Sequence, residues 1–411
     1  MSAAVFLRRR CVPALTSLLL LAAVACRESV TAPGLCPEFC LAGDIALRDT
    51  VLAGVITADS SFQGYRFAHH AAQMQVAGSG GPVESRGLVT FARFSATFTG
   101  TDTSASRTII ATDSFGLSFN LVRRGPGTGL ALLVYRLGVV PDSATTWDDV
   151  APFFADTALA GSIAIPDTVQ TGAVSAVFPA SAFPSFTPDS FAMSVGLRMA
   201  GPTFVDLSTI EAITATILTR YTRHDSAGTA VTRSETRGGT FDTFMADPAN
   251  LGALAGLRVG GLPAARVLLR MSGPDSSVLA NVVDSTQVVR ATLLLVPAQP
   301  AIGAAGDTFR LRVHGIGADF GAKSPLIIEG ADTVETGSTR VPVSSGDTIR
   351  IDITHVLREW RRSPKLPRSM MLRVIPEAAS VAALDLLPSS SPAGRPSLHV
   401  TYVSPYRFPG R

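Results

Sequence analysis

The spacing of apolar residues from Ala46 onwards is the feature that most constrains how this chain can fold. Short apolar or alternating runs are separated by Gly, Pro, Asp, Ser and Thr, a pattern typical of β-sandwiches and barrels. Clear alternation occurs at 309–313, 349–353 and 398–402. Because 46% of the residues are hydrophobic and only 16% are charged, the chain can bury a core. The sequence therefore predicts an all-β fold.

Residues 354–362 interrupt the strand pattern. Val356, Leu357 and Trp360 fall on one side of a helical turn, and arginines occupy the other side. We expect Thr354 to cap this short helix and Pro364 to lie beyond its end. The helix would plug one end of a sandwich.

Four segments of the first half of the chain resemble four segments of the second half, in the same order and at nearly constant separation. This arrangement predicts duplication of one module, and hence two tandem jelly-roll-like β-sandwiches. The matched segments are Arg86–Ser95 with Arg266–Ser272, Ser114–Val122 with Val288–Val296, Phe191–Met199 with Met370–Pro376, and Ile217–Tyr221 with His399–Tyr402.

Composition sets the expected boundaries of the modules. Residues 223–256 are polar and Gly-rich at first, so we expect a linker there, or an edge strand of the second module. The predicted parts are a signal peptide at 1–25, an anchor and tether segment at 26–45, a first module at 46–222, a second module at 257–404 and a tail at 405–411.

The first residues have the three parts of an export signal: Arg8–Arg10, an apolar stretch from Val12 to Leu21, and small residues ending at Cys26. The apolar stretch is too short to span a bilayer. The ending resembles the lipobox of bacterial lipoproteins, which implies that Cys26 is diacylated and anchors the protein in a bacterial envelope. By the same resemblance, Arg27 favours the outer membrane. The alternative is an ordinary signal peptide that is cut nearby and leaves Cys26 free.

Cys36 and Cys40 form an even pair in a chain expected to reach an oxidising compartment. A disulfide between them would close a very short loop, so we expect a local staple near the anchor. The rival interpretation is a redox or metal pair. A metal site would need further ligands at suitable spacing, and the nearest histidines, His69 and His70, are far along the chain.

The second module resembles the DNRLRE domain, a jelly-roll module of secreted and envelope proteins with similarity to carbohydrate-binding modules. The resemblance covers roughly residues 255–403 and rests on 289–296 (VRATLLLV), 351–360 (IDITHVLREW) and 395–402 (RPSLHVTY). The first module shares only the stretch 145–149 (TTWDD). The matching positions are mostly core positions, so the resemblance implies a fold rather than an activity.

Catalytic and cofactor motifs are absent from the sequence. It contains no G-x-S-x-G elbow and no phosphate loop, and its six histidines form no metal-ligand motif. Asp148 and Asp149 are adjacent carboxylates, which point apart in a loop. His314 and His399 fall on outward strand positions. We therefore expect no enzyme activity, no metal and no cofactor. The basic residues are scattered at a net charge of +3, which argues against a nucleic-acid partner.

The two tryptophans are the candidates for a sugar platform. Trp360 is better explained as the buried anchor of the predicted helix. Trp147, on a predicted loop, is either an exposed platform or a lid over the sandwich.

The sequence therefore predicts an exported, lipid-anchored envelope protein with a non-catalytic binding or structural role. Its expected partners are the membrane, through the anchor, and a polysaccharide or another envelope protein. One alternative is a glycan-binding lipoprotein that uses Trp147. Another is an envelope hydrolase, which would need an open pocket holding two or more acidic or histidine side chains.

Overall fold

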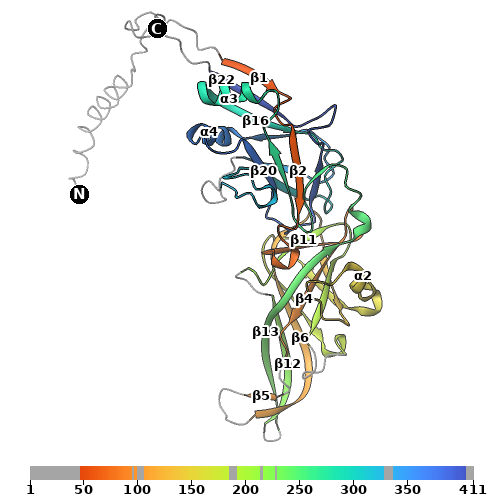
Figure 1. Cartoon of the computed structure of the whole chain (residues 1–411). Helices are drawn as coiled ribbons and strands as arrows, with labels where there is room; N and C mark the ends of the chain where they lie inside the picture. The colour runs from red at the N-terminus through yellow and green to blue at the C-terminus, as the bar shows by residue number, and fades with distance from the viewer. Residues whose placement is uncertain are drawn as a thin grey trace, which may run out of the picture. The chain divides into compact units, whose positions relative to one another are not determined.

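The computed structural model describes residues 47–94, 97–99, 106–184, 192–212, 216–226, 229–327 and 337–403. These residues are mostly β-strand with a few short helices (Figure 1), so the predicted all-β fold of sandwiched sheets is confirmed. The predicted signal peptide, the tether and the tail lie outside the described residues. So do the lipidation site Cys26 and the cysteine pair Cys36 and Cys40.

The N-terminal sandwich spans residues 73–246. Its strands pair antiparallel in the order β13-β12-β6-β11-β3-β4-β10-β7-β8, with β5 and β9 on β6. An additional pairing of β13 with β4 closes part of this sheet on itself. The elements are β3 (Gln73–Ala77), β4 (Ser85–Phe91), β5 (Thr97–Thr99), β6 (Ser106–Arg124), β7 (Leu130–Arg136), α2 (Trp147–Val150), β8 (Leu159–Ile165), β9 (Gly172–Pro179), β10 (Ser194–Met199), β11 (Phe204–Ser208), β12 (Ile217–Ser226) and β13 (Thr229–Ala246).

The C-terminal sandwich is built from residues 47–63 and 257–403. One sheet has the order β1-β22-β16-β19, and the other has the order β18-β17-β20-β15-β14-β21 with β2 on β15. The elements are β1 (Leu47–Leu52), β2 (Ala58–Gln63), β14 (Leu257–Gly260), β15 (Ala265–Arg270), α3 (Ser276–Ser285), β16 (Gln287–Leu295), β17 (Thr308–Gly315), β18 (Ser338–Pro342), β19 (Ile349–Asp352), α4 (Thr354–Arg362), β20 (Ser369–Ile375), β21 (Ala383–Leu386) and β22 (Ser397–Val403).

Helix α4 has the predicted position, and it buries Val356, Leu357 and Trp360 in the core of the C-terminal sandwich. The expected cap is wrong. Ile353 occupies the N-cap position, and the Thr354 hydroxyl instead accepts a hydrogen bond from the Ala291 amide at 2.9 Å. A second helix, α3, was not predicted, so the C-terminal sandwich contains two helices where the sequence indicated one.

The two sandwiches share several strand pairings. In the N-terminal sandwich β8, β7, β10 and β4 are neighbours in that order, and in the C-terminal sandwich β18, β17, β20 and β15 are. On the other side β12 pairs with β6, and β22 pairs with β16. The segments matched in the sequence thus form β4 and β15, β6 and β16, β10 and β20, and β12 and β22. The pairing pattern supports an internal repeat.

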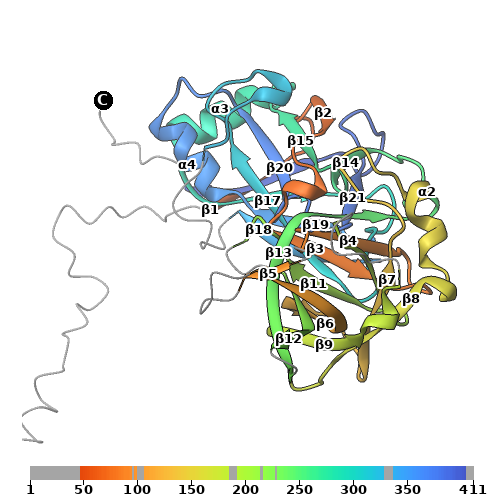
Figure 2. The same cartoon turned by 90° about the horizontal axis from the view of Figure 1, so that it is seen from below.

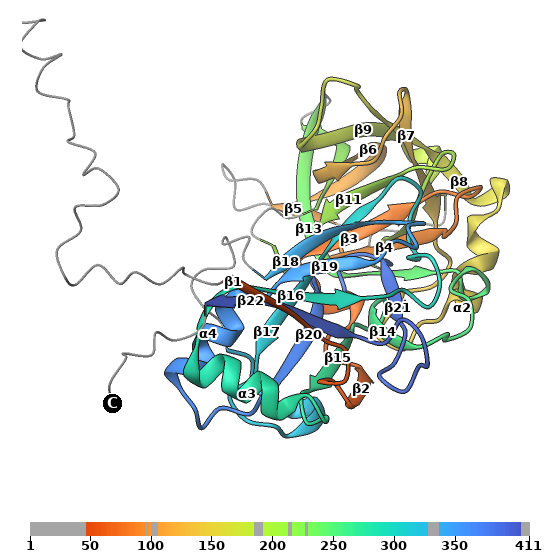
Figure 3. The same ribbon diagram turned by 90° about the horizontal axis from the view of Figure 1, so that it is seen from above.

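The two repeats exchange their first strands. Residues 47–63, which precede β3 in the chain, pair with β22 and β15 of the C-terminal sandwich. Strand β13, which precedes β14, pairs with β12 and β4 of the N-terminal sandwich. Figures 1 and 3 show that β1, the first described strand, lies beside β22, the last one. We call residues 47–63 and 229–246 the leading segments. Each one completes the sandwich formed by the other repeat.

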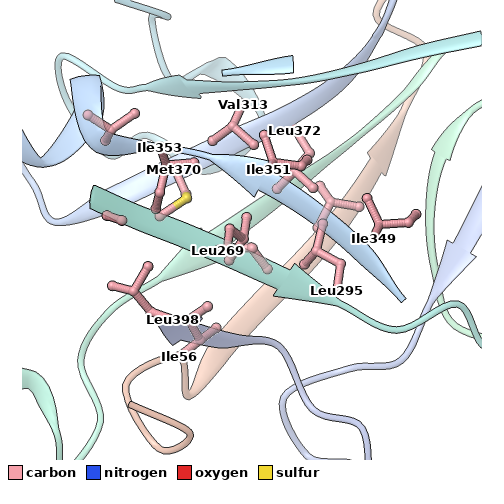
Figure 4. Close-up of a cluster of buried hydrophobic side chains, with 14 of the residues drawn as sticks. Ile56, Leu269, Leu295, Val313, Ile349, Ile351, Ile353, Met370, Leu372 and Leu398 are labelled. Carbon is pink, nitrogen blue, oxygen red and sulfur yellow. The ribbon is translucent and has the colours of Figure 1, made fainter. Parts of the chain in front are cut away.

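The exchange corrects the expected boundaries. Residues 47–63 lie in the second module rather than the first, because Val55 and Ile56 are buried in the C-terminal core. Figure 4 shows Ile56 beside Leu398 of β22. Within the segment 223–256, residues 229–246 form β13, which buries Phe244 in the N-terminal core. These residues are therefore neither a linker nor part of the second module.

The exchange predicts that a core mutation in a leading segment loosens the sandwich of the other repeat. Ile56→Ala should destabilise the chain by about 2–5 kcal/mol and raise amide exchange in β15 and β22. Phe244→Ala should cost about 3–5 kcal/mol and raise exchange in β4 and β12. Urea unfolding and hydrogen exchange read by mass spectrometry measure both effects.

Val51→Ala is the matched control, because Val51 lies on the same leading segment with its side chain 59% exposed. It should change stability by less than about 0.5 kcal/mol. Faster exchange confined to β4 and β12 in Ile56→Ala would contradict the exchanged arrangement.

Candidate functional site

A groove of about 520 Å³ lies where the two sandwiches meet. Its size is within the range of small-molecule sites, which often lie between domains. Figure 2 views the two sandwiches from below, one in front of the other, and Figure 1 shows β11 at the end of the N-terminal sandwich next to the C-terminal one. The N-terminal sandwich contributes Gln73, Val122, Arg123 and Asp206, and the C-terminal sandwich contributes Thr308, Phe309, Arg310, Arg340, Val374, Ile375, Pro376, Ala379 and Ser380.

Arg123 binds a carboxylate from each side of the junction. Its Nε donates to Asp206 Oδ2 at 2.6 Å, and its Nη1 donates to Asp307 Oδ1 at 2.6 Å. Asp206 lies on β11, whereas Asp307 directly precedes β17 of the C-terminal sandwich. Both carboxylates are buried, and the arginine side chain is 40% exposed toward solvent. One guanidinium therefore connects the two sandwiches.

Gln75 of β3 makes the second polar connection. Its Nε2 donates to Asp307 Oδ2 at 2.7 Å and more weakly to Asp206 Oδ1 at 3.3 Å. Its Oε1 accepts a hydrogen bond from the Val381 amide at 3.2 Å. The Thr308 amide also donates to Asp307 at 2.6 Å. The buried polar groups thus bond to one another across the junction, as buried polar groups must.

Apolar contacts surround this network. Val381, in the loop between β20 and β21, is buried in the core of the N-terminal sandwich. Ala304 of the C-terminal sandwich packs against Ala77 and Phe204. Interdigitated side chains of this kind transmit strain and resist relative motion, so the groove has fixed walls.

Burial raises the pKa of Asp206 to about 6, despite the opposing attraction of Arg123 and its hydrogen bond. The nearby charge of Asp307 raises it further. Desolvation is the largest cause, because the Asp206 side chain lines the groove but is only 5% exposed. The group is therefore poised to bind a proton near neutral pH.

The lining of the groove favours binding over acid–base catalysis. Asp206 is its one acidic residue, and no histidine occurs among the described lining residues. Both oxygens of Asp206 are engaged by Arg123 and Gln75. Arg310 and Arg340 lie directly opposite each other on β17 and β18 and line the same groove. A hydrolase would need a free carboxylate pair or a histidine, which this part of the structure does not supply.

Trp147, the sequence candidate for a sugar platform, is half-buried at the start of α2. The Arg86 guanidinium lies over its ring at 3.9 Å from the centroid and over Phe154 at 4.4 Å. Arg86 is in turn held by Glu84 at 2.8 Å. One face of the indole is therefore covered by a cation–π contact.

Asp149, next to the tryptophan, has a structural role. Its Oδ2 accepts hydrogen bonds from the Thr146 amide at 2.8 Å and the Thr146 hydroxyl at 2.7 Å, which lowers its pKa. These bonds fasten the first turn of α2. Neither Trp147 nor Asp149 lines the groove at the junction.

A second hollow, of about 460 Å³, lies in the N-terminal sandwich and is mostly apolar. Val139, Val140 and Phe153 contribute to its walls. Its one charged residue, Arg136, donates to the backbone carbonyls of Ala182 and Thr157, so its guanidinium is used structurally.

The predicted surface position of His314 is wrong. The side chain does project from the outer face of its sheet, but it is buried, and Arg373 Nε donates to its Nε2 at 3.0 Å. His399 is partly exposed and lies 3.7 Å from Asp49. Among the described residues no group of three or more His, Cys, Asp or Glu side chains could hold a metal ion.

A comparison with known proteins finds no matching protein family and no matching curated protein. The resemblance to the DNRLRE domain stays a prediction. Among the described residues no helix has the length and apolar character needed to cross a bilayer.

No sequence motif marks the groove, because Arg123, Asp206 and Asp307 come from distant parts of the chain. The nearest sequence signal is Gly306-Asp307, a dipeptide typical of a turn before a strand, and it does not indicate a buried carboxylate.

The raised pKa of Asp206 predicts a pH dependence of stability. Because the carboxyl binds its proton more tightly in the folded chain, its contribution to the free energy of unfolding is full below about pH 4 and is lost as the pH rises through about 6. Asp206→Asn should therefore flatten the fall in stability over this range. Urea unfolding at several pH values measures it.

Asp242 serves as the comparison, because burial raises its pKa to about 6 as well. Asp242→Asn should remove a separate part of the same fall, and the double variant should be flatter than either single variant. An unchanged pH profile in Asp206→Asn would contradict the assignment.

The junction network predicts that removing one charge destabilises both sandwiches. Asp307→Ala removes one of the two buried carboxylates that Arg123 and Gln75 contact and leaves them Asp206 alone, and it should cost about 1–3 kcal/mol. Asp319→Ala is the control. It breaks an equally short pair with Arg270 on a partly exposed surface and should cost less than about 1 kcal/mol. Equal losses in the two variants would refute the role assigned to the network.

Proposed function

We propose that this chain is an exported, lipid-anchored protein of a bacterial envelope with a non-catalytic binding or structural role. Its first residues carry the pattern of an export signal that ends at Cys26. The body that follows has a rigid groove whose buried carboxylates are already occupied. This occupation is the observation that carries the non-catalytic assignment.

The groove at the junction is the better candidate binding surface than Trp147. It has walls from both sandwiches, three arginines and the hydroxyl groups of Thr308 and Ser380. A polysaccharide or another envelope protein is the proposed ligand class, with no nucleic-acid partner. The glycan-binding alternative through Trp147 is weaker, because Arg86 covers one face of the ring.

The hydrolase alternative ranks last. It needs two acidic or histidine side chains free to act on a substrate in an open pocket. The groove and the hollow of the N-terminal sandwich offer one carboxylate, that of Asp206, and it is tied to Arg123. A further hollow is lined by His314, His355 and Glu359, but its volume of about 20 Å³ is far below that of a small-molecule site.

The anchor can be tested on the protein expressed in a bacterium with two membranes. Mass spectrometry should find a mature N-terminus at Cys26 that carries a diacylglycerol, and the protein should fractionate with the outer membrane. Cys26→Ser should lose the lipid and be recovered in a different fraction. An unmodified Cys26 in wild-type chain, or retention of the complete sequence in the cytoplasm, would exclude the lipoprotein assignment.

A further inference from the structure

The first leading segment, residues 47–63, is an exchangeable strand that docks on a preformed surface. We propose that this surface of the C-terminal sandwich also accepts the same segment from a second copy of this chain. The partner is thus another molecule of the protein, joined by exchange of β1 and β2. This inference is independent of the proposed anchor and of the groove.

The acceptor surface is specific along its whole length. Strand β1 pairs with β22 from Leu47↔Val403 to Leu52↔Leu398, and β2 pairs with β15 from Ala58↔Arg270 to Gln63↔Ala265. Between the two strands, Leu52, Val55 and Ile56 enter the C-terminal core. A segment that fits both sheets and the core between them must have this sequence and this register.

The crossing between β1 and β2 fits the acceptor closely. The Gly54 amide donates to Asp275 Oδ2 at 2.9 Å, and the Gly273 amide donates to the Val55 carbonyl at 3.2 Å. A Cβ added at Gly273 would lie 1.9 Å from the Gly54 carbonyl oxygen, so the backbones touch there. The C-terminal repeat therefore carries a glycine where the leading segment of the other repeat passes.

The backbone hydrogen bonds of the docked segment end before the segment joins its own repeat. The last of them to the acceptor is at Arg66, whose carbonyl accepts from the Ala264 amide at 2.9 Å, and β3 begins at Gln73. Between them, Ala71 is the residue that packs on the acceptor, in a small cluster with Ala264, Ala378 and Ala379 that exchange would have to open. Only residues 67–72 link the docked segment to the N-terminal sandwich. If the segment came from a second molecule, this short link would change its path and every pairing within the acceptor would be kept.

Strand β1 is the least tightly held part of the segment, whereas Leu52, Val55 and Ile56 must leave the core before the whole segment can exchange, so exchange requires partial unfolding of the C-terminal sandwich. Among the described strands, β1 lies at the edge of its sheet and pairs with β22 alone. The outward side chains of Leu47 and Val51 are already 64% and 59% exposed. Detaching the strand from β22 therefore exposes little additional apolar area of these two residues. Edge strands with exposed apolar residues are the usual sites of exchange between molecules.

Exchange within one chain is favoured by effective concentration alone. A short link holds the segment at a local concentration on the order of 1 mM. Exchange between copies should therefore become measurable when the protein approaches that concentration, and should be negligible at about 1 µM.

Two single-cysteine variants test the proposal. Val51 and His399 lie directly opposite on β1 and β22, within the Cα separation that a disulfide spans. In chains whose native cysteines are replaced by serine, Val51→Cys and His399→Cys variants are mixed in urea, refolded together and oxidised. At about 0.1 mM roughly a tenth of the chains should form the mixed disulfide dimer, and this fraction should fall about a hundredfold at 1 µM. Non-reducing gels and peptide mapping identify the bond.

Two controls decide the outcome. The double variant Val51→Cys with His399→Cys should form the same disulfide within one chain, which verifies the pairing and the refolding. Val51→Cys mixed with Val177→Cys, an exposed position on β9, gives the yield from random collision. A mixed dimer no more abundant than this background, or absence of the intrachain bond in the double variant, would overturn the proposal.

Discussion

The structure depends on the exchange of the leading segments between the two repeats. Strand β13 closes the N-terminal sandwich against β12 and β4, while β1 and β2 complete the two sheets of the C-terminal sandwich. Neither sandwich is complete without the other repeat. The described chain from Leu47 onwards accordingly groups into one compact unit, although it contains two separate cores.

The junction between the sandwiches combines this covalent constraint with a buried charge network. Buried ion pairs seldom add much net stability, because desolvation offsets their attraction, but they penalise every arrangement that leaves a charge unpaired. Here Arg123 meets Asp307 only when the two sandwiches are in the observed relation, whereas Asp206 lies opposite Arg123 on a paired strand of the same sandwich. The network therefore selects one relation of the sandwiches and so fixes the width of the groove between them.

Local patterns in the sequence were enough to predict the strands, helix α4 and the repeated order of segments. Alternating apolar residues and turn residues determine structure over a few neighbouring positions. The spacing of Trp360 from Val356 and Leu357 likewise indicates a helix locally. Helix α3 was missed, since its first turn is polar and Leu279 and Val282 read equally well as a strand. The exchange could not be predicted for a different reason. Because the two repeats have similar strands, each sandwich offers a similar surface to a leading segment. The local sequence pattern therefore does not indicate which leading segment pairs with which sandwich. The groove was invisible because its charges meet only after folding.

The pairing of Leu47 with Val403 brings the first and last described residues to the same rung of one ladder. A force that draws these two ends apart acts on that rung first and opens the β1–β22 hydrogen bonds one after another, a geometry that resists far less than shear along the strands. Such a force would separate β1 from β22 first. The strands of the N-terminal sandwich, including β13, lie outside this rung and would not be pulled apart in that step.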